Sequence, residues 1–147
     1  MFEFEWSQAA DHLVRILTAF ALAFPLGWER GSGRRSVGFR TLPVVAMASC
    51  GFALLARTLP GADADTQTRL LQGLMSGIGF IGGGAILKSD GSVHGLATAA
   101  SIWNVGAIGV AVAYDRIEIA VVLAVLNLLA LLLLTPVAKT VERNQED

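Results

Sequence analysis

Charged, thiol and imidazole side chains are all scarce in this sequence. Charged residues make up 16% of its 147 residues, whereas a soluble domain usually carries about 25%. The single cysteine excludes an intramolecular disulfide, and two histidines are too few for a histidine-based metal centre. The net charge of −1 provides no basic face, so we expect no nucleic-acid partner.

Long apolar runs are what the sequence has instead. Hydrophobic residues make up 54% of the chain, and the mean hydropathy is +0.60. A membrane crossing needs about 20 mostly apolar residues. Three uncharged runs meet this length (Leu70–Leu87, Gly95–Tyr114 and Ile119–Ala138), and two shorter runs reach it if charged residues at their ends snorkel to the interface.

We therefore predict an all-α polytopic membrane protein, a bundle of about five transmembrane helices that forms a single membrane domain over residues 1–147. The expected helices cover about 12–30, 41–59, 69–87, 95–114 and 117–137. The segment 29–40, "ERGSGRRSVGFR", carries four arginines in one short loop. Because lysine and arginine mark the cytoplasmic side, five crossings place the N-terminus outside and the C-terminus in the cytoplasm. The acidic N-terminal segment is unlike a secretory signal.

The stretch 77–82, "GIGFIG", matches the G-x-G-x-x-G pattern of dinucleotide-binding proteins. That pattern requires a preceding strand and an acidic residue about 20 residues later. Neither is present, because the stretch lies inside a long apolar run and is followed by "LATAASIWN". We interpret the match as accidental and expect no cofactor.

The same glycines suit helix packing in lipid, where small residues let helix backbones approach closely. Two G-x-x-x-G pairs on different faces predict a helix that is packed tightly on more than one side; the alternative is a helix broken at residues 82–84 that lines a cavity. The next apolar run adds small residues and Asn104, which we expect to form an interhelical hydrogen bond. The predicted packing glycines are Gly73, Gly77, Gly79, Gly82, Gly83, Gly84, Gly106 and Gly109.

Three segments, "GWERG…VGFRT", "SGIGFIGGGAIL" and "VHGLATAASIWNVGAIG", resemble the N-terminal membrane domain of the MgtC/SapB family. The resemblance implies a bacterial inner-membrane protein with about five transmembrane helices. It also implies an accessory role in adaptation to low magnesium, exercised on other membrane proteins, the ATP synthase among them. The implied motif positions are Gly27, Glu29, Arg30, Gly38, Arg40, Thr41, Gly77, Gly79, Gly82, Gly84, Gly95, Thr98, Ala99, Trp103 and Gly109.

The sequence departs from the family pattern in three respects. Ala97 replaces the asparagine that usually precedes Thr-Ala-Ala, and Asn104 stands where some virulence-linked members have cysteine. We expect no counterpart of the soluble C-terminal domain of those members, since the sequence ends with "AKTVERNQED". We therefore expect a membrane-only relative.

Few polar residues are candidates for a site. Glu29 and Arg30 are expected at the inner end of the first helix, where they form either a charged site with Arg40 or an interfacial anchor. Asp63 and Asp65 could bind a divalent cation or simply belong to a loop. The functional candidates are Glu29, Arg30, Arg40, Thr41, Thr98, Trp103 and Asn104.

The last apolar run is nearly all large aliphatic and predicts a lipid-facing helix, with Asn127 turned inward. No catalytic constellation or metal-ligand spacing is visible, so we do not expect an enzyme. The sequence favours an accessory protein that binds partners within the bilayer, with a homo-oligomer as a further expectation. The alternative is an oligomeric transporter or channel for Mg²⁺ or another small ion.

Overall fold

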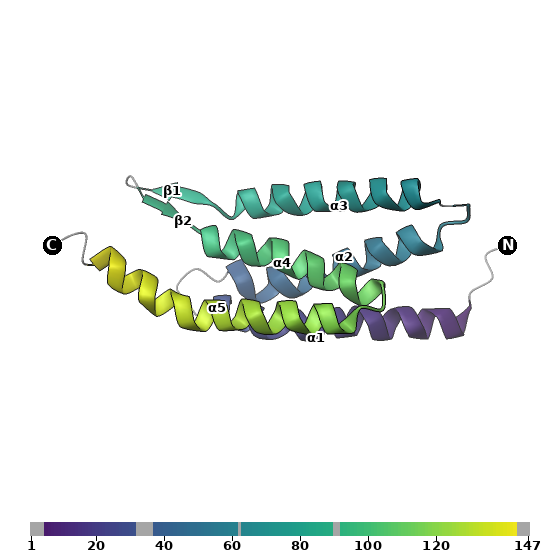
Figure 1. Cartoon of the computed structure of the whole chain (residues 1–147), viewed down its shortest axis with the longest axis horizontal. Helices are drawn as coiled ribbons and strands as arrows, with labels where there is room; N and C mark the ends of the chain where they lie inside the picture. Colours follow the sequence, from purple (N-terminus) through teal and green to yellow (C-terminus); the bar gives the residue numbers. More distant parts are fainter. Residues whose placement is uncertain (1–4, 32–36, 62, 90–91, 144–147) are drawn as a thin grey trace.

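The computed structural model describes residues 5–31, 37–61, 63–89 and 92–143, and these form an elongated helical bundle (Figure 1). The helices run roughly along a common axis. The start of α1 and the end of α5 lie at opposite ends of the bundle. In chain order the elements are α1 (Trp6–Gly31), α2 (Val37–Thr58), α3 (Ala64–Gly84), β1 (Leu87–Ser89), β2 (Ser92–His94), α4 (Leu96–Ala113) and α5 (Ile117–Arg143).

The predicted all-α membrane fold is confirmed. Four of the described helices are long and apolar enough to cross a membrane, namely α1, α2, α4 and α5. The exception is α3, whose first turns carry Asp65, Gln67 and Arg69 before its apolar stretch. At about 1.5 Å per residue, its 21 residues still extend about 30 Å beside its neighbours (Figure 1).

The described helices differ from the expected ranges mainly at their ends. The first begins at Trp6, and the last continues to Arg143. α3 is unbroken through Gly82 and ends at Gly84. The antiparallel hairpin of β1 and β2 follows, with Leu87 opposite His94.

α4 is the central helix, because it contacts each of the other four. Its side chains Ile102, Val105 and Ile108 are fully buried. α5 instead exposes a row of leucines and valines, as expected for a helix facing lipid.

Glycine allows the closest helix contacts in the bundle. A Cβ on Gly109 of α4 would lie 2.3 Å from the carbonyl oxygen of Ala46 and 2.9 Å from the backbone nitrogen of Cys50. At the α1–α2 corner, a Cβ on Gly27 would lie 3.0 Å from the carbonyl oxygen of Phe39. These two helix pairs therefore pack backbone against backbone.

α3 attaches to α4 through a smaller contact. Ile78 is buried and fills the notch at Gly106, and Gly82 lies against the backbone of Ala99. The hairpin then returns the chain to α4 through Gly95, whose φ of +90° favours glycine. A Cβ at Gly95 would lie 2.0 Å from the carbonyl oxygen of Ala85, so this joint requires glycine.

Candidate functional site

A polar cavity lies between α4 and α5 at the end of the bundle that carries the hairpin. Its volume is about 790 Å³. Its polar lining residues come from α1, β2, α4 and α5, and its apolar walls are mainly leucines and alanines of α4 and α5. We call it the Arg30 cavity; its lining residues include Arg30, His94, Ser101, Asn104, Asn127 and Thr135.

Arg30 joins the α1–α2 corner to α5. Its Cβ packs on Gly38, where an added Cβ would come within 2.2 Å of it. Its Nη2 donates a hydrogen bond to Thr135 Oγ1 at 3.3 Å. Its Nε is buried and has no hydrogen-bond partner in the described part of the chain. Arg30 is thus held between α2 and α5, with its Nε donor unpaired among the described residues.

A seam of polar side chains joins α4 to α5 along the cavity. Asn104 Nδ2 donates to the carbonyl oxygen of Leu123 at 3.3 Å, so its predicted interhelical hydrogen bond is confirmed. Ser101 Oγ donates to the carbonyl oxygen of Ala97 at 2.9 Å and lies 3.3 Å from Asn127 Oδ1. Asn127 therefore points inward, as predicted, with its amide group against the Ser101 hydroxyl.

Sequence reasoning missed Ser101 and Thr135 as members of this site. Both are small hydroxyl residues whose hydrogen bonds to their own helix backbone are common in apolar helices, so neither stands out alone. Ser101 could have been found from its spacing to Asn104, because residues three positions apart lie on the same face of a helix.

The other predicted site residues are spread over the same end of the bundle. Arg40 is exposed in the first turn of α2, whereas Glu29 and Thr41 are half-buried. Thr98 is half-buried in the first turn of α4. Of the charged residues in this set, Arg30 is the one that lines the cavity.

A second concave surface separates α2 from α3, and we call it the α2–α3 groove. Its volume is about 580 Å³, and its lining includes Gly73, Gly77 and Phe80 of α3. Ser49 of α2 also lines it; this side chain is 1% exposed, and its hydroxyl has no hydrogen-bond partner among the described residues.

Most of the predicted packing glycines of α3 have no neighbour from another helix close to them in the described part of the chain. A Cβ on Gly82 would lie 3.4 Å from the carbonyl oxygen of Ala99. The others would meet nothing within 4 Å; they are Gly73, Gly77, Gly79, Gly83 and Gly84. Of the two predicted glycines in α4, Gly106 packs against α3 and Gly109 against α2.

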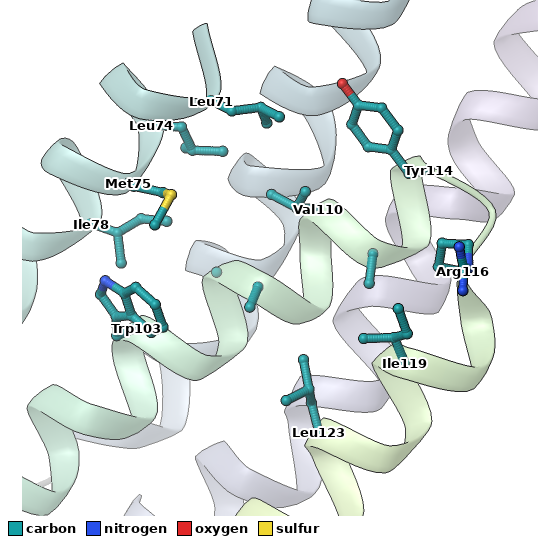
Figure 2. Close-up of a pocket in the computed structure, with 13 residues that line it drawn as sticks. Leu71, Leu74, Met75, Ile78, Trp103, Val110, Tyr114, Arg116, Ile119 and Leu123 are labelled. Atoms are coloured by element: carbon teal, nitrogen blue, oxygen red, sulfur yellow. The ribbon is translucent and has the colours of Figure 1, made fainter. Parts of the chain in front are cut away.

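A third pocket of about 350 Å³ lies on the other side of α3, against α4 and α5 (Figure 2). Figure 2 shows Trp103 below Met75 and Ile78 at one end, and Tyr114 and Arg116 toward the other. Trp103 is half exposed. α3 is thus bordered by concave apolar surfaces on both sides.

Ion pairs cluster at the opposite end of the bundle from the Arg30 cavity. Asp115, in the turn between α4 and α5, accepts hydrogen bonds from Arg15 and from Arg57, the latter at 3.0 Å. These two guanidinium groups lower the pKa of Asp115. The cluster joins α1 and α2 to the α4–α5 turn.

The two aspartates considered for cation binding lie at the start of α3. Asp63 is the N-cap residue, and its side chain accepts a hydrogen bond from the backbone N–H of Thr66 at 2.8 Å, which lowers its pKa. The described residues contain no group of three or more histidine, cysteine, aspartate or glutamate side chains that could hold a metal ion.

Comparison with known proteins gives one family. The model of the MgtC family matches residues 16–140. No solved structure matches the chain.

Several curated proteins are similar over nearly the whole chain. An uncharacterized protein of Synechocystis sp. is 35% identical over 91% of this chain and 55% of its own length. Protein MgtC of Brucella abortus is 33% identical over 93% of this chain and 57% of its own length. Protein MgtC of Salmonella typhimurium is 31% identical over 90% of this chain and 56% of its own length. The chain therefore spans about half the length of these relatives.

Proposed function

Because the chain belongs to the MgtC family, we propose that it is a non-catalytic accessory protein of the bacterial inner membrane that acts by binding a transmembrane helix of another protein. The binding surface is the α2–α3 groove. The partner lies among the membrane proteins on which the cell depends at low magnesium, and the family resemblance makes the ATP synthase a candidate.

The open glycines of α3 carry this proposal. Gly73 and Gly77 line the groove with no atom within 4 Å of where their Cβ atoms would lie. Glycine weakens a helix by about 1 kcal/mol relative to alanine in water. The open glycines therefore destabilise α3 without enabling a close contact inside the described part of this chain. They do allow a second helix to approach the backbone closely, which is a principal source of helix association in lipid.

Phe80 describes the partner helix further. Ser49 contributes little to the groove surface, because it is 1% exposed and its Cβ packs toward Gly109 of α4. Phe80, 85% exposed, stands at the same groove and offers apolar contact area. The expected partner helix is apolar with a small-residue face.

The test is crosslinking and affinity capture of the full chain from native membranes, at low and at high magnesium. Gly73→Leu and Gly77→Leu fill the groove and should abolish capture of the partner. Gly79→Leu is the matched control, because this glycine is equally open but does not line the groove. Capture of nothing beyond lipid and the chain itself would contradict the proposal, and loss of the partner only in Gly79→Leu would contradict the choice of groove.

The alternative of a Mg²⁺ transporter receives less support from the geometry. The described residues lining the Arg30 cavity include a cationic arginine and no carboxylate. Mg²⁺ prefers oxygen ligands, usually with one or two carboxylates. Flux into liposomes containing the purified chain tests this directly, and we expect no Mg²⁺ entry above that of empty vesicles.

A further inference from the structure

The pocket that α3 forms with α4 and α5 (Figure 2) is lined almost entirely by apolar side chains, and we call it the Trp103 pocket. Arg116 is the one charged residue among its described lining residues. Its volume of about 350 Å³ is at the lower end of the range for small-molecule sites, about 300–1,000 Å³. A slender apolar molecule is therefore the kind of ligand that suits it.

The Trp103 pocket has about the length of one leaflet of a bilayer. On α4 it extends from Tyr114 to Trp103, a rise of about 16 Å at about 1.5 Å per residue. The hydrocarbon core of a bilayer is about 30 Å thick, so one leaflet contributes about 15 Å. A single acyl chain that enters at the membrane surface spans this distance.

The two ends of the pocket differ in polarity. Tyr114 and Arg116 lie toward the end at the α4–α5 turn, whereas Trp103 lies below Met75 and Ile78 at the other end (Figure 2). Tyrosine and arginine favour the interface between lipid and water. A ligand with a polar head and an apolar chain would therefore place its head beside Arg116 and its chain toward Trp103.

Opposite charges lie next to each other at the polar end. Arg116 Nε donates to Glu118 Oε1 at 2.5 Å, and the two side chains are 61% and 62% exposed. Both charged groups are thus accessible to a headgroup. A zwitterionic phospholipid carries a phosphate and an ammonium group close together, and these complement Arg116 and Glu118 respectively.

We propose that the Trp103 pocket binds one acyl chain of phosphatidylethanolamine, with the phosphate at Arg116, the ammonium group at Glu118 and the chain directed toward Trp103. Bulk lipid is as apolar as the pocket, so burial of apolar surface does not by itself favour this site. The preference comes from packing contacts along the chain and from the charged pair at the entrance.

A second transmembrane helix suits this pocket less well. Gly106 is the glycine among its described lining residues, and its open side is already filled, because an added Cβ would lie 2.4 Å from Ile78 Cδ1. Close approach of a second backbone, which favours helix association in lipid, is thus blocked here. The inference does not depend on the α2–α3 groove or its partner.

The experiment uses the full chain purified in detergent, with Trp6→Phe and Trp28→Phe so that Trp103 is the remaining tryptophan. Phosphatidylethanolamine brominated near the ends of its acyl chains is added, and quenching of Trp103 fluorescence reports a chain in the pocket. Phosphatidylcholine and phosphatidylglycerol with the same bromination are compared. Native mass spectrometry of the unsubstituted chain counts the lipids that stay bound.

Four variants separate the pocket from the headgroup contacts. Ala107→Phe fills the pocket, because Ala107 lines it. Ala130→Phe is the matched control, because Ala130 is an exposed alanine of α5 that does not line this pocket. Arg116→Gln and Glu118→Gln each remove one charge of the exposed pair.

We expect saturable quenching by phosphatidylethanolamine and retention of one lipid per chain. Ala107→Phe should weaken binding roughly tenfold or more through lost packing contacts, and Ala130→Phe should leave it unchanged. Arg116→Gln and Glu118→Gln should each weaken it by up to about fivefold, as for an exposed charge pair. Phosphatidylcholine should bind less tightly, because its quaternary ammonium has no N–H to donate to Glu118.

Quenching that does not saturate and is equal in Ala107→Phe would indicate bulk lipid and would overturn the proposal. Tighter binding of phosphatidylglycerol than of phosphatidylethanolamine would overturn the assignment of the headgroup. If Ala107→Phe does not fold, Val110→Phe fills the same pocket from α4 and decides the question.

Discussion

Two groups of glycines in this molecule have opposite surroundings. Gly27 and Gly109 lie where α1 and α4 cross α2, and there a Cβ would meet backbone atoms at 3.0 Å or less. Gly73 and Gly77 of α3 would meet nothing within 4 Å. The first pair closes the core of the chain, and the second leaves a surface open to another helix.

The difference shows that glycines in an apolar helix predict that the helix can pack closely, but they do not predict which helix it packs against. In lipid, small residues permit backbone contact wherever a second helix is present. Within this chain α2 supplies that helix for α4, whereas none of the described helices comes as close to Gly73 and Gly77 of α3. Substitution of a glycine by a larger residue should therefore lower stability in the first region and raise it in the second.

The largest effect is expected for Gly109→Ala. The added methyl would overlap the backbone of Ala46 and Cys50, which cannot move away without shifting α2. Overpacking of this kind costs about 1–3 kcal/mol or more, so the unfolding temperature in detergent should fall clearly. Gly51→Ala is the control, because it sits on α2 in open space. Equal unfolding temperatures for the two variants would contradict the close α2–α4 crossing.

A smaller loss is expected for Asn104→Leu. This change removes the hydrogen bond to the carbonyl oxygen of Leu123 that joins α4 to α5. Interhelical hydrogen bonds in membrane proteins contribute about 0.6 kcal/mol on average, and we expect a destabilisation of that order in chemical unfolding. A destabilisation as large as that of Gly109→Ala would mean that the polar seam, and not the glycine crossing, dominates the core.

Gly77→Ala should raise the stability of the chain by about as much as Asn104→Leu lowers it. It removes the low helix propensity of glycine without meeting any atom of the chain, and it should stabilise α3 by up to about 1 kcal/mol. Reversible unfolding of the purified chain measures this. Destabilisation would show that another helix contacts Gly77, either within the chain or from a second copy of the chain.

The smallest effect is a pH dependence at the end of the bundle remote from the Arg30 cavity. Because Arg15 and Arg57 lower the pKa of Asp115 below its ordinary value of 3.8, their ion pairs stabilise the fold above that pH. The stabilisation is lost as the pH falls through the lowered pKa. Asp115→Asn keeps a residue that tolerates the left-handed backbone at φ 60°, so it should reduce stability slightly at neutral pH and weaken the acid dependence. Identical acid profiles for the two proteins would exclude the ion pairs as a source of stability.

Much of the fold was predictable from the sequence, because a bilayer imposes the length and polarity of each helix. The inward position of Asn127 followed in the same way, since an amide facing lipid would lack partners. The bounds of α3 were harder to predict, because its polar first turns and its terminal glycines dilute the apolar signal.

The candidate site was predictable only in part. Arg30 was singled out with Glu29 and Arg40 from one short segment, but its contacts are with Gly38 on α2 and Thr135 on α5. Asn127 and Ser101 are 26 residues apart in the chain, and no spacing within one helix relates them. The pairing of distant polar residues depends on how α4 and α5 are rotated against each other.

The sequence by itself determined that the chain is a helical membrane protein of the MgtC family, because apolar run length and three spaced motifs are local properties. The tertiary structure alone decided which glycines pack against another helix and which do not, and that polar side chains of different helices line one cavity. The physical reason is that close packing and hydrogen-bond satisfaction are properties of pairs of helices, and helix rotation and crossing are set by the packing of the whole bundle.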